Sequence, residues 1–157
     1  MTILDADIFR KNINKNDTIF GIDPGTKTIG IAVGNYSNAI STPVAVIKRK
    51  KFTLDMKELE KLVNEYNVKA FIVGLPLNMD GSEGKRCQST RDFVAEMNRF
   101  FEDKIKITFQ DERLSTHEAE TFLINEVDLT RKKRSNVIDK MAAQNILQTA
   151  LDSYLYK

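Results

Sequence analysis

The chain of 157 residues has one cysteine, Cys87, and one histidine, His117. A single cysteine cannot form an internal disulfide framework, and it excludes a cysteine-rich zinc site. A single histidine excludes a metal site built from several histidines and leaves little basis for Ser-His-Asp catalysis. A metal site in this chain would therefore be built from carboxylates.

Long apolar runs are also absent. Residues 1–17 hold no apolar core of signal-peptide length, and no run approaches the ~18 apolar residues of a transmembrane helix. The sequence therefore predicts a cytoplasmic protein with no membrane partner. Its 24 Lys and Arg nearly balance its 22 Asp and Glu, which excludes a histone-like polycation and an acidic tail protein but not a local basic patch.

Length and composition indicate one globular domain. Hydrophobic residues make up 41% of the chain and charged residues 29%, a mixture typical of soluble globular proteins. We interpret residues 1–17, which are polar and mixed in charge, as a poorly specified N-terminal extension before the fold begins. A single domain is expected over residues 18–157.

Short apolar runs bounded by turn residues predict five strands. The first three, over residues 18–23, 28–33 and 42–47, have tight connections and predict an antiparallel meander. Two later strands, over residues 70–74 and 105–109, alternate with helical segments. This order predicts an α/β fold with one mixed sheet covered by helices.

Apolar residues at helical spacing predict the helices. A capping box at residues 115–118 predicts a short helix, and a charged loop over residues 126–134 is expected before a last helix capped by Ser135 or Asn136. The two longer stripes predict helices over residues 52–66 and 87–101.

Four acids lie at the ends of predicted elements. Asp23 ends the first strand, Asp111 and Glu112 follow the last, and Asp139 lies in the first turns of the final helix. Because sites gather at the carboxyl ends of strands in open α/β sheets, we expect these acids to converge in one cleft. Oxygen ligands suit Mg²⁺ or Mn²⁺, and two such ions ~3.5–4 Å apart can clamp the attacking water and the leaving oxygen of a phosphodiester.

Each acid also has a plainer structural interpretation. Asp23, before Pro-Gly, can be a turn residue, and either acid after the last strand can pair with Arg113. Asp139 can interact favourably with the N-terminus of its helix. Two alanines one turn later allow that helix to approach the sheet closely, which favours an Asp139 that faces the site.

Two basic tetrads occur in the sequence, at residues 48–51 and 131–134. A lone tetrad is usually a solvated loop, but two tetrads that flank a candidate carboxylate site favour contact with a phosphate backbone. His117 is expected on the surface, and Cys87 lies on an apolar helical stripe that places it in the core.

Four segments in this order resemble the motifs of the YqgF/RuvX family, the Holliday-junction-resolvase-like proteins. The resemblance covers residues 18–155 and implies an RNase H-like fold, with a five-stranded mixed sheet and flanking helices. It also implies a cytoplasmic nuclease that matures the 5′ end of pre-16S rRNA. The segments are residues 20–30 (FGIDPGTKTIG), 73–82 (VGLPLNMDGS), 111–119 (DERLSTHEA) and 131–143 (RKKRSNVIDKMAA).

Carried over by position, the resemblance implies Asp23, one acid of the Asp-Glu-Arg motif and Asp139 as catalytic and metal-binding residues. In the resolvase relatives an acid sits on the fourth strand, where this chain reads IVG at residues 72–74. The second acid must therefore come from the Asp-Glu-Arg motif. We favour Glu112, whose longer side chain can reach the cleft from the end of the strand, with Asp111 as the alternative.

The implied partner is nucleic acid, with precursor rRNA in ribosomal precursor particles as the expected substrate. Branched DNA is the alternative substrate, and a non-catalytic RNA-binding module for ribosome assembly is the alternative function. Converging carboxylates argue against a pure binder, because they repel phosphate unless a metal is present. The residues expected to contact nucleic acid are Lys27, Arg113, Arg131, Lys132, Lys133 and Arg134.

The first motif is also similar to the phosphate loop of actin-like and sugar-kinase ATPases. Those enzymes need two such domains to enclose a nucleotide, and this chain has the length of one. It also has no G-x-x-x-x-G-K-[ST] loop.

Overall fold

A computed structural model describes residues 3–112 and 131–155; in the second range it describes the side chains of 138 and 140–153. The five strands form one sheet in the order β3-β2-β1-β4-β5. Strands β1, β2 and β3 pair antiparallel, whereas β4 and β5 run parallel to β1, so the predicted meander and mixed sheet are confirmed. The strands are β1 (Thr18–Pro24), β2 (Thr28–Gly34), β3 (Thr42–Lys48), β4 (Val68–Leu75) and β5 (Lys106–Asp111).

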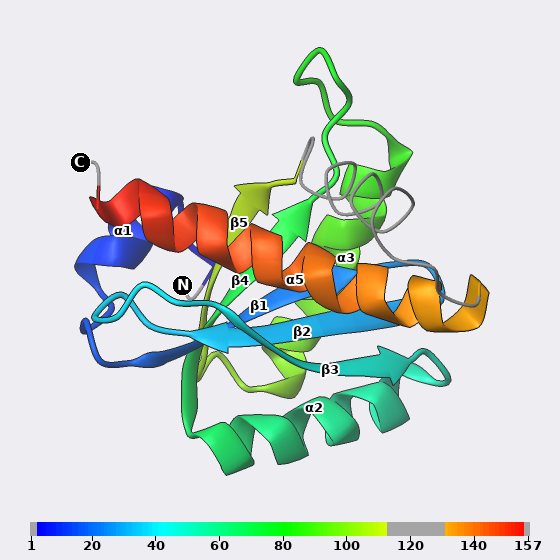
Figure 1. Ribbon diagram of the computed structural model, residues 1–157, viewed down its shortest axis with the longest axis horizontal. Helices are drawn as coiled ribbons and strands as arrows, with labels where there is room; N and C mark the ends of the chain where they lie inside the picture. The colour runs from blue at the N-terminus through cyan, green and yellow to red at the C-terminus, as the bar shows by residue number, and fades with distance from the viewer. Residues whose placement is uncertain (1–2, 113–130, 156–157) are drawn as a thin grey trace.

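Helices cover both faces of the sheet (Figure 1). Alternation along β1 divides the core, because Phe20 and Ile22 pack with one pair of helices and Ile19 packs with the other. Helices α2 (Phe52–Tyr66) and α3 (Lys85–Phe100) cover the first face, and α1 (Ala6–Lys11) and α5 (Arg131–Leu155) cover the second.

Helix α5 lies unusually close to the sheet. A Cβ atom at Gly21 of β1 would lie 2.6 Å from Leu147 Cβ, so only glycine allows this approach. Ala143 is fully buried here, which confirms that the small residues bring the helix onto the sheet. Leu147 and Leu151 contact Gly34, which pairs with the start of β1, so α5 runs antiparallel to β1 and its earlier turns lie toward the carboxyl end of that strand.

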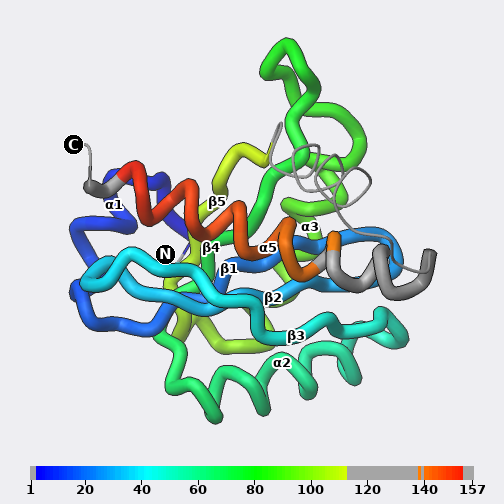
Figure 2. Tube along the Cα trace, viewed as in Figure 1, coloured from blue at the N-terminus to red at the C-terminus, as the bar shows by residue number. Residues whose placement is uncertain are grey.

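The N-terminal segment is part of the fold. The Leu4 amide donates to the Ile107 carbonyl at 2.8 Å, which ties the segment to β5. Phe9 of α1 is fully buried, and Figure 2 shows α1 beside the last turns of α5. The interpretation of this segment as poorly specified is therefore wrong for residues 3–13, because its polar composition concealed two buried side chains, Phe9 and Ile13. The boundary at residue 17 stays a prediction.

The start of the last helix also differs from expectation. Helix α5 begins at Arg131, so the basic tetrad 131–134 is helical and not the end of a loop. Lysine and arginine are good helix formers, and the capping signal at Ser135 was misleading. The capping box at 115–118 and His117 lie outside the described residues. Within the described ranges, no helix is both long and apolar enough to cross a membrane.

The burial of Phe9 can be tested by substitution. Phe9→Ala should lower the free energy of unfolding by about 3–5 kcal/mol, the usual cost of removing a buried phenylalanine. Ile8→Ala on the same helix is the control, because Ile8 is 47% exposed. Urea unfolding measures both, and equal small losses in the two variants would show that α1 does not pack on the sheet.

Candidate active site

Two acids meet at the carboxyl edge of the sheet. Asp23 is the penultimate residue of β1, and Glu112 directly follows β5. Since β1, β4 and β5 are parallel, these ends lie along the same edge, and the two side chains interact. The expected convergence is therefore found for this pair, which we call the carboxylate pair.

The Glu112 side chain lies over the end of β4. A Cβ atom at Gly74 would overlap Glu112 Oε2 and Ile146 Cδ1, so a glycine is needed for the carboxyl group to fit between strand and helix. Oε2 is buried and has no hydrogen-bond partner among the described atoms. Sequence reasoning missed this role of Gly74, although a glycine in a buried strand is a signal of close approach.

Burial raises the pKa of Glu112 to about 8. The negative charge of Asp23 and a hydrogen bond with its side chain act in the same direction, and Asp111 adds a smaller contribution. The positive charge of Arg86 opposes the shift. These contributions favour the protonated form of Glu112 beside Asp23 in the metal-free protein.

The other two candidate acids have different positions. Asp111 ends β5 and pairs with Leu75 of β4. Asp139 lies in α5, one turn before Ala143, on the part of the helix that runs toward the Asp23 end of β1; its side chain is outside the described residues. In the part of the chain that is described, no three acidic, histidine or cysteine side chains surround a common point.

Of the basic residues expected to contact nucleic acid, the structure describes the side chain of Lys27, which lies near the same edge of the sheet. Lys27 is exposed in the turn between β1 and β2. Arg113 and the side chains of 131–134 are not described. Arg86, in the first turn of α3, was missed, because the adjacent pair Lys85 and Arg86 in a polar loop-to-helix segment gives no distinctive signal in the sequence.

Cys87 has the structural role that was expected. Its side chain is fully buried, and its thiol donates to the Pro76 carbonyl at 3.2 Å. This contact fixes α3 against the loop that follows β4.

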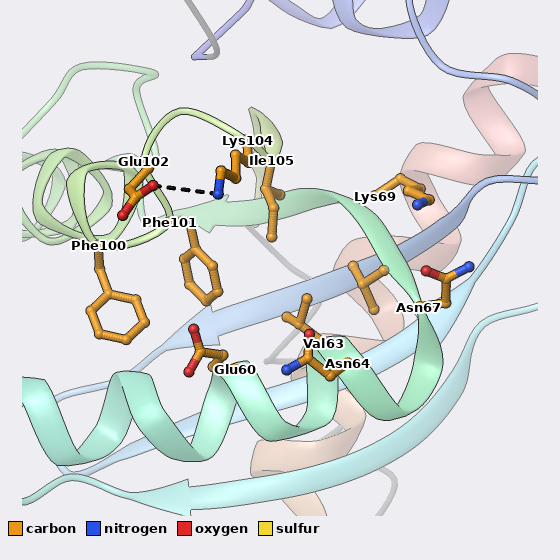
Figure 3. A pocket seen from close by; sticks show the side chains of 11 residues that line it. Glu60, Val63, Asn64, Asn67, Lys69, Phe100, Phe101, Glu102, Lys104 and Ile105 are labelled. Carbon is orange, nitrogen blue, oxygen red and sulfur yellow. Dashed lines mark ion pairs between the residues drawn. The ribbon is translucent and has the colours of Figure 1, made fainter.

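A surface cavity lies away from the carboxylate pair. It has a volume of about 440 Å³ and is lined by residues from the end of α2, the start of β4 and the α3–β5 connection. Figure 3 shows Glu60, Phe100 and Lys104 around it, with an ion pair between Glu102 and Lys104. Because β4 and β5 begin there, this cavity is at the opposite edge of the sheet from the two acids.

Comparison with known proteins assigns the chain to a family. The family model described as "RuvX: Holliday junction resolvase" matches residues 17–153. The "Putative pre-16S rRNA nuclease" of Caulobacter vibrioides NA1000 is 44% identical over 152 residues, which cover 97% of each chain. The protein of the same name from Ruegeria pomeroyi is 52% identical over 132 residues, 84% of each chain.

A solved structure has a similar fold. The Fowlpox virus resolvase, in complex with Holliday junction DNA, superposes with a TM-score of 0.55 over 88% of this chain and 99% of its own. Its sequence identity is 13%, so the likeness concerns the fold alone. It confirms the RNase H-like architecture that the motifs predicted.

The raised pKa of Glu112 predicts how stability depends on pH. Between pH 4.5, its ordinary pKa, and about 8, the folded metal-free protein binds more protons than the unfolded chain. The free energy of unfolding therefore falls as pH rises through this window and levels off above it. Glu112→Gln has no such titrating group, so it should not lose this stability as pH rises. The Tm of the variant minus the Tm of the wild type should therefore increase from pH 5 to 8, by roughly 2–4 °C for each kcal/mol that the wild type loses.

Thermal unfolding in chelator measures this difference. Glu96→Gln on the exposed side of α3 is the control and should keep a constant offset from the wild type. A constant offset for Glu112→Gln as well would show that Glu112 is ionised in the folded protein at neutral pH.

Proposed function

The chain belongs to the RuvX family, and from this membership we propose that it is a nuclease that hydrolyses phosphodiester bonds in the 5′-end processing of pre-16S rRNA in the cytoplasm. The observation that carries the proposal is the carboxylate pair, held at the carboxyl edge of the sheet. The names of the relatives, which match over nearly the whole chain, support the substrate.

The carboxylate pair fits a divalent cation. Glu112 Oε2 is a buried oxygen without a partner among the described atoms, and Asp23 supplies further carboxylate oxygens beside it. Hard oxygen donors suit Mg²⁺ or Mn²⁺. Asp23, Glu112 and Asp139 would hold the metal, with Asp111 in place of Glu112 as the alternative. In a two-metal arrangement the ions would activate water and stabilise the leaving oxygen.

The protein prepares this site by holding its ligands in place. The turn after β1 is closed by the Gly25 amide, which donates to the Asp23 carbonyl at 3.1 Å and to the Thr28 carbonyl at 2.9 Å. The Glu112 amide donates to the Leu75 carbonyl at 3.3 Å and fixes the acid to the end of β4. Cation binding would remove the proton that Glu112 holds, since a ligating carboxylate must be ionised.

The basic residues would position the nucleic acid over this edge. Lys27 lies in the turn next to Asp23, and the tetrad 131–134 forms the first turn of α5, on the side toward the carboxyl end of β1. Together with Arg113 they would contact phosphates, which fix the register of a strand without reading its bases. Ribosomal precursor particles are the proposed setting.

A second candidate function is cleavage of branched DNA. The description of the matching family model as a Holliday junction resolvase favours it. Both candidates use the same carboxylate pair, so the substrate distinguishes them and the chemistry does not.

Cleavage assays test the proposal. A precursor 5′ leader of 16S rRNA and a four-way DNA junction are incubated with the wild type in Mg²⁺, in Mn²⁺ and in chelator. We expect metal-dependent cleavage of the RNA. Cleavage of the junction alone would favour the resolvase, and binding without cleavage in any metal would leave a non-catalytic RNA-binding module.

Three variants assign the acids. Glu112→Gln and Asp139→Asn should each lower the cleavage rate more than about 100-fold while the protein remains folded, since each removes a ligand. Asp111→Asn should cost about tenfold, the smaller effect typical of a residue that orients a ligand. A larger loss for Asp111→Asn than for Glu112→Gln would reverse the assignment, and unfolding of Asp139→Asn with unchanged cleavage per folded molecule would make Asp139 structural.

A further inference from the structure

A small cavity lies beside the carboxylate pair. It has a volume of about 120 Å³, below the ~300–1,000 Å³ of sites for drug-sized ligands, so it suits one small chemical group. The turn directly after Asp23 forms one wall, and the first turns of α3 form another. Its lining includes Pro24, Gly25, Thr26, Arg49, Arg86 and Ser89.

Arg49 is held in place at this cavity. It follows β3 and belongs to the basic tetrad 48–51, which the proposed function does not use. Its guanidinium donates to the Gly25 carbonyl at 2.6 Å and lies 5.0 Å from the centre of the Phe93 ring. Neither contact neutralises its charge, so the structure orients a cation toward the cavity.

Arg86 supplies a second positive charge. Its side chain is exposed, and within the described part of the chain it has no hydrogen bond or ion pair. It lines the cavity, and its charge also acts on Glu112 of the carboxylate pair. The hydroxyl groups of Thr26 and Ser89 are further donors in the lining.

Arg91, five residues further along α3, shows the contrast. Its guanidinium makes two hydrogen bonds to the Glu83 carboxylate, at 2.7 and 2.8 Å, and lies over the Phe109 ring. That arginine is neutralised in place. Within the described residues neither arginine at the cavity makes such a two-bond pair with an acid, although the charge of Arg86 also acts on Glu112, so both can still donate to a bound anion.

We propose that this cavity binds a backbone phosphate of the nucleic acid next to the phosphate that is cleaved, with Arg86 and Arg49 as its ligands. The inference rests on the proposed function, because it needs a strand lying across the carboxyl edge. The size of the cavity, its two arginines and its hydroxyl donors match one tetrahedral anion. Its position beside Asp23 makes Arg86 and Arg49 positioning residues for the strand.

Binding of single-stranded RNA in chelator, followed by fluorescence anisotropy at several salt concentrations, tests the inference without cleavage. Arg86→Gln should weaken binding roughly tenfold, as expected for a lost charge-assisted hydrogen bond, and make the salt slope shallower by about 0.7. Arg86→Lys should restore the slope. Arg99→Gln at the other end of α3 is the matched control and should leave both values unchanged.

Unchanged slopes for both Arg86→Gln and Arg49→Gln would overturn the inference. If these variants also cleave RNA at the wild-type rate, the proposed nuclease function is kept and only the phosphate site is ruled out. If the wild type neither binds nor cleaves nucleic acid, the proposed function fails and the inference fails with it. Thermal unfolding of Arg49→Gln shows whether loss of its contacts with Gly25 and Phe93 affects folding.

Neutral linkages locate the phosphate. An RNA with one methylphosphonate at each position near the cleavage site should lose cleavage efficiency at the linkage that the cavity binds. In Arg86→Gln the same linkage should cause no further loss, while neutral linkages elsewhere keep their effect. Equal losses in both proteins at every position would contradict the assignment.

Discussion

Two carboxyl groups side by side on a partly buried edge of a sheet repel each other when both are ionised, and the candidate site depends on this constraint. The Glu112 carboxyl group packs against Gly74 and Ile146 with its Oε2 atom buried, and Asp23 lies beside it. In the metal-free protein the raised pKa of Glu112 favours a proton there, which relieves the repulsion. A divalent cation would relieve it with positive charge, which explains why this unfavourable arrangement can be useful to a nuclease.

The close packing of α5 makes this arrangement possible. Because Gly21 has no side chain, α5 can pack closely against β1. Because Gly74 has none, the Glu112 carboxyl group can fit against β4 beside Ile146. An acid on β4 could not occupy that space together with Glu112. Gly74 on β4 and Glu112 after β5 therefore depend on each other. Gly74 leaves the space, and the Glu112 carboxyl group fills it from the end of the neighbouring strand β5.

Much of the fold could be predicted because its signals are local. Short apolar runs bounded by turn residues predicted all five strands, and helical spacing predicted α2 and α3. The burial of Phe9 and the role of Arg86 could not be predicted, because each depends on residues far away in the sequence. Gly74 in a buried strand signalled a close approach, but the sequence does not show that Glu112 is the group that approaches. The convergence of Asp23 and Glu112 was predictable, since strand direction alone brings those ends together. The role of Asp139 remains a prediction.

We infer that Glu112 holds a proton beside Asp23 and releases it when a cation binds. Calorimetric titration with Mn²⁺ at pH 7, in buffers with different ionisation enthalpies, counts the protons released on binding. The wild type should release about one proton, and Glu112→Gln should release almost none, since a metal ligand must be deprotonated. Binding of Mn²⁺ to the wild type without proton release, or equal release by both proteins, would contradict the claim.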